Sequence, residues 1–133
     1  MKTTLNLLPN NFGTFFIKII IVFISLILFD FVYLSFAKNY YYISKNPVNL
    51  ISAILSWILI AYIISIQDSS SVIESIIYGL TIGLVVYGVF NLVNYAILKE
   101  WKLNIVLMDT IWGMTVCSLA AIILYLFKKY LQF

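Results

Sequence analysis

Long apolar runs, separated by short polar segments, make up most of this chain. Each of four runs has at least the roughly 17 residues that a helix needs to cross the hydrocarbon core of a bilayer. The runs cover residues 15–37, 50–66, 72–98 and 103–127. Helix is the expected structure because backbone N–H and C=O groups in lipid must be satisfied within their own segment. The pattern therefore predicts an all-α integral membrane protein, a four-helix bundle.

Polar or helix-breaking residues lie at the predicted boundaries. Pro47 precedes the second run, and the sequence QDSSS at 67–71 separates the second run from the third. Only residues 99–102 separate the third run from the fourth, so these two helices are predicted to be antiparallel neighbours. The first run is longer than the roughly 7 to 15 apolar residues of a signal peptide, which favours a retained span. The short connections leave no room for a second domain, so residues 1–133 are predicted to form a single transmembrane domain.

The composition agrees with a membrane protein and disfavours several classes of function. Of the residues, 64% are hydrophobic and 10% are charged, whereas soluble domains carry about 25% charged residues. All eight basic residues are lysines, and the chain contains neither Arg nor His. Arg is the usual residue for bidentate recognition of phosphate and nucleic acid, and His is the commonest metal ligand. We therefore expect no nucleic-acid partner, no metal and no cofactor, and we expect the lone Cys117 to be a packing residue.

The lysines do not fix the orientation in the membrane. With four spans both termini lie on one side, here called side A, and the opposite side is called side B. Loops on the cytoplasmic side usually carry the excess of Lys and Arg. The count is tied, with Lys2, Lys18, Lys128 and Lys129 on or near side A and Lys38, Lys45, Lys99 and Lys102 on or near side B. The compact pair 128–129 next to a span favours cytoplasmic termini.

Polar side chains inside the predicted spans gather in the half nearest side B. An Asp at the centre of a span costs about 2.5 to 3.5 kcal/mol to insert, so it usually faces the bundle interior. Asp30 lies roughly 10 Å from the side-B end of the first span, at about 1.5 Å per residue, and Asp109 lies at a matching depth in the fourth. The same half contains Asn91, Asn94, Ser52 and Ser56. We find no comparable polar set in the half nearest side A.

The predicted helical faces agree with a polar pocket beside a close-packed seam. At 100° per residue, one face of the third helix, about 120° wide, carries Gly79, Gly83, Tyr87, Asn91 and Asn94. Small residues at this spacing let two helix backbones approach closely. On the fourth helix Asp109 and Gly113 share a face, so Gly79, Gly83 and Gly113 are predicted to pack helices together. The predicted ligand- or ion-binding residues are Asp30, Asn91, Asn94, Asp109, Trp112, Tyr87 and Ser56.

Two interpretations of the polar cluster remain open. In the first, the groups only satisfy one another, with an Asn of the third helix donating to Asp109 and Tyr33 or Tyr87 donating to Asp30. Such interhelical hydrogen bonds average about 0.6 kcal/mol and serve packing. In the second, the carboxyls bind a ligand, because Asn or Ser would serve for packing at a lower insertion cost than Asp.

Three segments resemble a known family. They are residues 29–34 (FDFVYL), 87–101 (YGVFNLVNYAILKEW) and 109–113 (DTIWG). Together they are similar to the motifs of a set of predicted four-span membrane proteins, domain of unknown function 2177. The residues that match these motifs are Asp30, Asn94, Lys99, Trp101, Asp109, Trp112 and Gly113. Asn91 stands where the family tends to carry Asp, and Tyr33 where it carries Trp. The resemblance implies four spans and supports the polar cluster, but it implies no activity, because none is established for the family.

Three classes of function follow from these observations. The leading hypothesis is a small carrier or channel-like protein, or a binding subunit of one, in which Asp30 and Asp109 bind a proton, a cation or a cationic solute. Four spans are few for a complete pathway, so this hypothesis also expects a homo-oligomer. The alternative is a non-catalytic interaction or assembly factor that packs against a membrane-protein partner through its Gly-rich helix face. An intramembrane enzyme has the least support, because no nucleophile–base pair or phosphate-binding loop is recognisable.

Overall fold

The apolar runs form four α-helices in the part of the chain that the structure, a computed structural model, describes, which is residues 11–37 and 49–132. The helices are α1 (Phe12–Ala37), α2 (Leu50–Ser65), α3 (Val72–Ile97) and α4 (Leu103–Leu131). The prediction of an all-α bundle is confirmed. The structure starts α1 at Phe12 instead of residue 15 and extends α4 to Leu131 instead of residue 127. Lys2, Lys38, Lys45 and Pro47, which entered the predictions above, lie outside the described residues.

Three of the helices, α1, α3 and α4, are long and apolar enough to cross a membrane. The fourth, α2, has 16 residues, so at about 1.5 Å per residue it is roughly 24 Å long. That length is less than the roughly 30 Å of a typical hydrocarbon core. Large apolar side chains cover the outside of the bundle, among them Phe31 and Phe36, which are 75% and 77% exposed. Such a surface suits contact with lipid.

Short polar side chains fix the starts of α2 and α3. Asn49 caps α2, where its Oδ1 atom accepts a hydrogen bond of 3.1 Å from the Ser52 backbone N–H. Ser71 caps α3 in the same way, since its hydroxyl accepts a 3.2 Å hydrogen bond from the N–H of Glu74. Each cap satisfies a backbone donor that has no partner inside the helix. The polar segments between the apolar runs therefore set where these helices begin.

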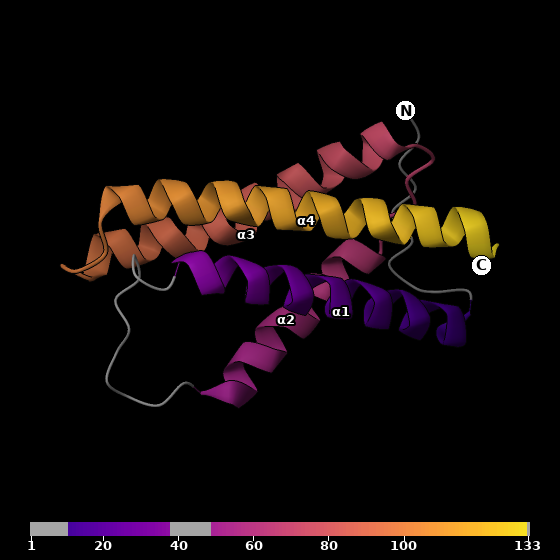
Figure 1. Cartoon of the computed structure of the whole chain (residues 1–133), viewed down its shortest axis with the longest axis horizontal. Coiled ribbons are helices and arrows are strands. Elements are labelled where there is room, and N and C mark those ends of the chain that lie inside the picture. The colour runs from indigo at the N-terminus through magenta and orange to yellow at the C-terminus, as the bar shows by residue number, and fades with distance from the viewer. Residues whose placement is uncertain (1–10, 38–48, 133) are drawn as a thin grey trace.

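The central helix of the bundle is α4, which packs against all three others. Figure 1 shows α1 running alongside α4 in the opposite direction, with α2 inclined to both. The most extensive contact joins α3 and α4, as their short connection predicts. By contrast, α2 and α3 touch little. A hydrogen bond of 2.6 Å from the Tyr78 hydroxyl to the Ile63 carbonyl oxygen joins these two helices near their shared loop.

Glycines allow α3 and α4 to pack backbone against backbone. A Cβ atom added at Gly79 would lie 2.3 Å from the Cα of Ser118, and one added at Gly83 would lie 2.3 Å from the carbonyl oxygen of Gly113. Both separations are far shorter than any van der Waals contact, so no other residue fits without moving the helices apart. This is the close approach that small residues permit between membrane helices.

The apolar core lies in the half of the bundle nearest side A. Its fully buried members come from α1, α2 and α4: Val22, Leu26, Ala61, Ile64, Val116, Cys117, Ala120, Ala121 and Leu124. Five of these nine residues lie between Val116 and Leu124 of α4, and the other four belong to α1 and α2. The core thus depends on α4, whose small residues let α1 and α2 approach it.

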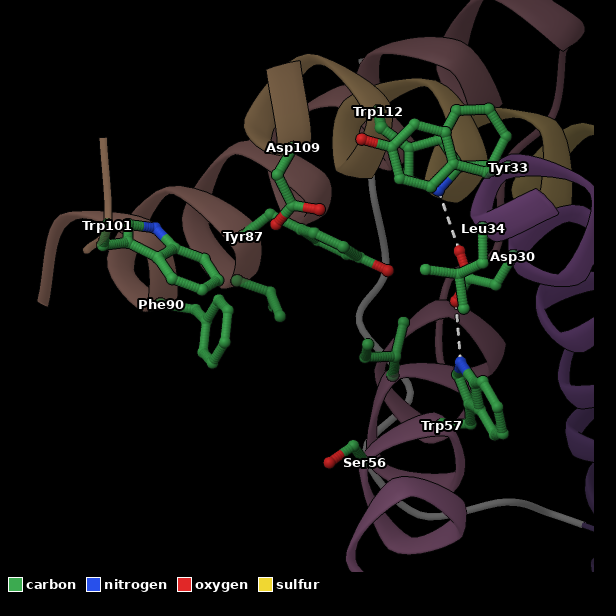
Figure 2. Close-up of a pocket in the computed structure, with 12 residues that line it drawn as sticks. Asp30, Tyr33, Leu34, Ser56, Trp57, Tyr87, Phe90, Trp101, Asp109 and Trp112 are labelled. Carbon is green, nitrogen blue, oxygen red and sulfur yellow. Dashed lines mark hydrogen bonds between the residues drawn. The ribbon is translucent and has the colours of Figure 1, made fainter. Parts of the chain in front are cut away.

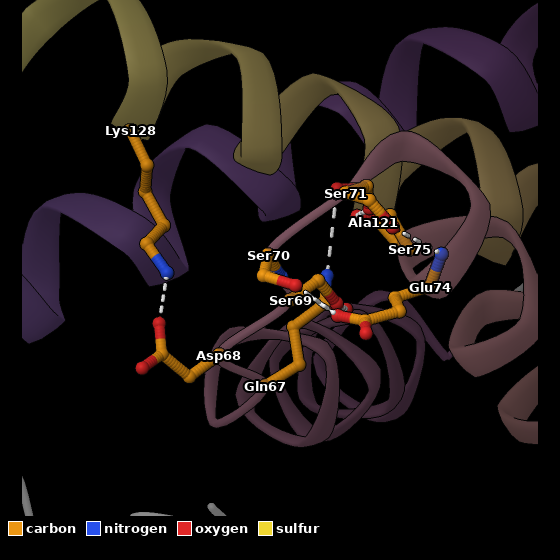
Figure 3. Close-up of polar contacts among 9 residues, drawn as sticks. All are labelled: Gln67, Asp68, Ser69, Ser70, Ser71, Glu74, Ser75, Ala121 and Lys128. Carbon is orange, nitrogen blue, oxygen red and sulfur yellow. Dashed lines mark hydrogen bonds and ion pairs between the residues drawn. The ribbon is translucent and has the colours of Figure 1, made fainter. Parts of the chain in front are cut away.

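A polar cluster, in which Gln67 is buried and Asp68 is exposed, joins the α2–α3 loop to α4 at the side-A end (Figure 3). Gln67 is only 3% exposed, and its Nε2 atom donates to the Ala121 carbonyl oxygen at 3.4 Å. The Ser69 hydroxyl donates to Gln67 Oε1 at 2.6 Å, and Asp68 forms an ion pair with Lys128. Gln67, Asp68, Ser69 and Lys128 lie just outside the predicted spans, so this cluster does not bear on the prediction that the spans of this half carry no comparable polar set. A loop that folds against the bundle must satisfy its buried polar groups.

Candidate functional site

A cavity lies among the four helices, in the half of the bundle nearest side B (Figure 2). Its volume is about 420 Å³, which is within the range of roughly 300 to 1,000 Å³ typical of ligand pockets. Every helix contributes to the wall, and the α3–α4 connection contributes Trp101. The lining residues of the helices are Asp30, Tyr33 and Leu34 of α1, Ser56, Trp57 and Ile60 of α2, Val86, Tyr87 and Phe90 of α3, and Asp109 and Trp112 of α4.

Asp30 is held by two tryptophans from different helices. Its side chain is 9% exposed, and its Oδ2 atom accepts a 2.7 Å hydrogen bond from the indole Nε1 of Trp57. Its Oδ1 atom accepts a 2.8 Å hydrogen bond from the indole of Trp112. One of the two interpretations left open by the sequence had Tyr33 or Tyr87 donating to Asp30, whereas two indoles donate to it in the structure. An indole N–H can only donate, so both oxygens of Asp30 act as acceptors for neutral groups.

The ring of Tyr33 fixes the position of one of these indoles. Tyr33 and Trp112 stack with their ring centroids 4.4 Å apart and their planes within 4° of parallel. Tyr33 lies one turn after Asp30 on α1, whereas Trp112 belongs to α4. The stack and the hydrogen bond to Asp30 therefore join the same two helices, and together they orient the carboxyl.

Asp109 is held by a chain of hydrogen bonds that begins at the α3–α4 connection. The Trp101 indole donates to Asn91 Oδ1 at 3.1 Å, and Asn91 Nδ2 donates to Asp109 Oδ2 at 2.6 Å. Asn91 Nδ2 also donates to the Tyr87 carbonyl oxygen at 2.8 Å. Because Trp101 can only donate, the amide oxygen of Asn91 must face Trp101 and its nitrogen must face Asp109. The structure thus selects Asn91 as the Asn of α3 that binds Asp109.

Tyr87 lies between the two aspartates. Figure 2 shows its hydroxyl pointing into the cavity, on the side of Asp30. The ring rests against α4 at Gly113, where an added Cβ atom would lie 2.0 Å from Cγ of Tyr87. Gly113 therefore makes the space that the phenol occupies.

The wall combines carboxyl groups with aromatic rings. Six aromatic side chains of the part of the chain that the structure describes line the cavity: Tyr33, Trp57, Tyr87, Phe90, Trp101 and Trp112. They include all three tryptophans of the chain. Among the described residues, no lysine lines the cavity. Aromatic faces carry negative electrostatic potential and attract cations, so the wall suits a positively charged or a neutral aromatic guest better than an anion.

Residues 15–126 match a family described as "Predicted membrane protein (DUF2177)". The chain belongs to this family. The match spans every residue that lines the cavity. No curated protein and no solved structure matches the chain. This DUF2177 protein is a membrane protein with three clear apolar spans and a fourth, shorter one.

The DUF2177 protein brings most of the predicted site residues to one cavity. Those that line it are Asp30, Ser56, Tyr87, Asp109 and Trp112. Asn91 is fully buried behind the wall, where it supports Asp109. Asn94 is half-buried and does not line the cavity. The Ser56 hydroxyl donates to the Ser52 carbonyl oxygen at 2.9 Å, so it is tied to its own helix.

Sequence reasoning missed Trp57 and Trp101 as parts of this site. Trp57 was not among the predicted site residues, and Trp101 entered only as a residue that matches the family motifs. A signal was available, because an indole N–H inside a membrane needs an acceptor. The strongest acceptors within the described spans of this side-B half are the two aspartates. The pairing of Asp30 with tryptophans was therefore open to prediction, although which tryptophans donate to it was not.

Proposed function

We propose that this DUF2177 protein binds an organic cation, whose ammonium group lies in the cavity between the aromatic rings and Asp30. The observation that carries the proposal is the environment of the Asp30 carboxyl. Its carboxyl is nearly buried, forms part of the cavity wall, and takes its hydrogen bonds from the neutral indoles of Trp57 and Trp112.

Neutral donors orient the Asp30 carboxyl but do not balance its charge. An ionised carboxylate within a membrane span carries a cost of several kcal/mol. A cation bound in the adjoining cavity would offset that cost, as charged groups in proteins usually pair when they are removed from water. The second carboxyl, Asp109, lines the same cavity and adds to the negative potential there.

The aromatic wall favours an organic cation over a bare metal ion. A hard metal cation takes about six or more oxygen ligands, whereas rings make up half of this lining. Alkylated ammonium groups are the cations that aromatic cages recognise. The aliphatic residues Leu34, Ile60 and Val86 complete the wall and suit the carbon skeleton of such a solute.

Intrinsic fluorescence offers a direct binding assay, because all three tryptophans line the cavity. The protein is placed in nanodiscs of phosphatidylglycerol, a lipid without an ammonium group, and is titrated with tetraethylammonium and with dodecyltrimethylammonium. With at least one of these cations we expect a saturable quenching of the tryptophan fluorescence or a saturable shift of its emission maximum. With uncharged dodecyl maltoside we expect neither change. Asp30→Asn should weaken binding by about ten- to a hundredfold, from a charged interaction of roughly 1.5 to 3 kcal/mol.

Two further variants separate loss of the site from loss of the fold. Asp68→Asn makes the same chemical change outside the cavity and should leave binding unchanged. Phe90→Leu removes a ring that is 54% exposed, so the bundle should tolerate it, and it should weaken binding about two- to fivefold through the lost cation–π contact. If no cation binds, or if Asp30→Asn and Phe90→Leu both bind as the wild type does, the proposal is wrong.

Transport of the bound solute forms the second step of the proposal. A homo-oligomer would supply the additional helices that a complete pathway needs. Asp30→Asn and Asp109→Asn should abolish uptake of a labelled cation that binds in the first assay, measured in proteoliposomes. Uptake equal to that of the wild type in both variants would contradict a carrier role.

The alternative, an assembly factor that packs against a partner through the glycine face of α3, has less support. Gly79 and Gly83 already contact the backbone of α4 within the same chain. A partner could reach this face only if α3 and α4 separated. The glycines are therefore accounted for by the internal packing of the bundle.

A further inference from the structure

We infer that the occupant of the cavity is a single-chain amphiphilic cation, such as an alkylammonium, that enters sideways from the bilayer between α2 and α3. This inference rests on the proposed function and adds to it the chemical class of the ligand and its route. The ammonium group lies near Asp30, and the alkyl chain leaves through the open side of the cavity.

The open side of the cavity is bounded by α2 and α3. The lining residues of α4 and the carboxyl of Asp30 are buried or half-buried, and they form the closed side. The lining residues that are exposed are Ser56 on α2, Val86 and Phe90 on α3, which are 36% and 54% exposed, and Leu34 on α1, which is 47% exposed. Over their whole lengths α2 and α3 touch little. Their Tyr78–Ile63 hydrogen bond closes the gap only near the loop on side A.

This opening lies at the depth of the acyl chains. Val86 precedes the side-B end of α3 at Ile97 by 11 residues (97 minus 86), which is roughly 16 Å along the helix. That distance places Val86 near the middle of a hydrocarbon core of about 30 Å. The outer faces of α2 and α3 carry exposed apolar side chains on both sides of the gap, including Leu59 and Val85. A molecule that enters here comes from lipid and not from water.

The side-B end of the cavity is closed by an aromatic pair within the described residues. Trp101 packs edge-on against Phe90, with ring centroids 5.9 Å apart, and it is tied to Asn91 by its indole hydrogen bond. Both rings line the cavity. A carboxyl at the closed side and an apolar exit to the bilayer match a molecule with one cationic end and one apolar end.

The inference is tested in two ways: by comparing cations with alkyl chains of different length, and by a substitution that narrows the opening between α2 and α3. Binding of tetramethylammonium, octyltrimethylammonium and dodecyltrimethylammonium is measured in phosphatidylglycerol nanodiscs, with partitioning into empty nanodiscs subtracted. Val86→Phe enlarges a side chain at the opening without adding a tryptophan. Val85→Phe is the matched control, because Val85 is its neighbour on α3, is 56% exposed and does not line the cavity.

We expect affinity to rise at least tenfold from tetramethylammonium to the dodecyl compound. Val86→Phe should weaken or slow binding of the dodecyl compound about tenfold while Val85→Phe leaves it unchanged. Equal affinities for the short and long cations, or equal effects of the two valine variants, would overturn the lateral route but leave the proposed cation site intact. If binding does not depend on the charge of the ligand and is unchanged in Asp30→Asn, both the cation site and the lateral route are wrong.

Discussion

At the scale of single residues, the two aspartates differ in how they are supported. Asp30 is held by side chains from two other helices, Trp57 of α2 and Trp112 of α4. Asp109 is held through Asn91, which is itself oriented by Trp101. Asn91 is the only one of these supports with both donor and acceptor atoms in its side chain, so the chain from Trp101 to Asp109 depends on its amide.

Replacement of Asn91 by Leu should destabilise the protein by about 1 to 3 kcal/mol, because it leaves buried polar partners without their hydrogen bonds. This exceeds the roughly 0.6 kcal/mol that an average interhelical hydrogen bond contributes in a membrane. Thermal unfolding in nanodiscs measures the effect. Asn94→Leu, one turn further along α3 and away from the cavity wall, is the control and should cost much less. Equal losses in the two variants would contradict the role given to Asn91.

The ion pair at the α2–α3 loop predicts a dependence on pH. The hydrogen bond from the Lys128 ammonium, more than any other influence, lowers the pKa of the Asp68 carboxyl. The pair therefore stabilises the folded state at pH values above the ordinary aspartate pKa, and this contribution is lost as the pH falls through the lowered pKa. Because half of the Asp68 side chain is exposed, solvent screening keeps the contribution below about 1 kcal/mol.

Comparison of the wild type with Asp68→Asn isolates this contribution. The difference in unfolding temperature should be small but measurable at pH 7, should shrink in high salt, and should be lost as the pH falls through the lowered pKa of Asp68. A difference that stays constant over this range would show that the ion pair does not titrate as described.

At the scale of elements, the α3–α4 pair is the most tightly packed unit, and its glycines differ in what they contact. Gly83 lies against the backbone of α4, with 2.3 Å from its ideal Cβ position to the nearest atom. Gly88 lies on the same helix, but the nearest atoms to its ideal Cβ position are side-chain methyls at 3.8 and 3.9 Å. Two glycines of the same helix thus have different structural roles.

Gly83→Ala should therefore destabilise the bundle by roughly 1 to 3 kcal/mol, the usual cost of overpacking. Gly88→Ala should be neutral or mildly stabilising, because Ala is the better helix former. Unfolding of both variants under identical lipid conditions provides the comparison. If Gly88→Ala proved the more damaging, the assignment of the α3–α4 seam would be wrong.

At the scale of the whole molecule, the bundle is divided into two unlike halves. The half nearest side A holds the apolar core, whereas the half nearest side B holds the cavity. The helices also differ in length, from 16 residues in α2 to 29 in α4. The shortest helix, α2, forms one wall of the cavity, so the surrounding bilayer must become thinner beside this wall to match its length.

The length of α2 predicts a preference for thin bilayers. A mismatch costs a fraction of a kcal/mol per Å, and α2 falls short of an average core by roughly 6 Å. The unfolding temperature should therefore be higher in nanodiscs of lipids with 14-carbon chains than in lipids with 22-carbon chains. Stability that rises steadily with bilayer thickness would contradict this account.

The sequence by itself determined the four helices, their order and the antiparallel contact of the last two. Apolar runs of this length have few alternatives in lipid, since each backbone must satisfy its own hydrogen bonds. The cost of burying carboxyls also indicated that Asp30 and Asp109 face the interior, and both line the same cavity. These results follow from the local pattern of apolar and polar residues and from the bilayer as the surrounding solvent.

The tertiary structure decided which residues form hydrogen bonds with the two aspartates. Helical periodicity placed Asn91 and Asn94 on one face, but only the docking of α3 against α4 selects Asn91 to bind Asp109. The indoles that bind Asp30 come from residues 27 and 82 positions away, and no local pattern specifies such a pairing. The same holds for the opening between α2 and α3. It exists because α4 packs against every other helix while α2 and α3 scarcely meet, and contacts between distant helices are set by the shapes of all four at once.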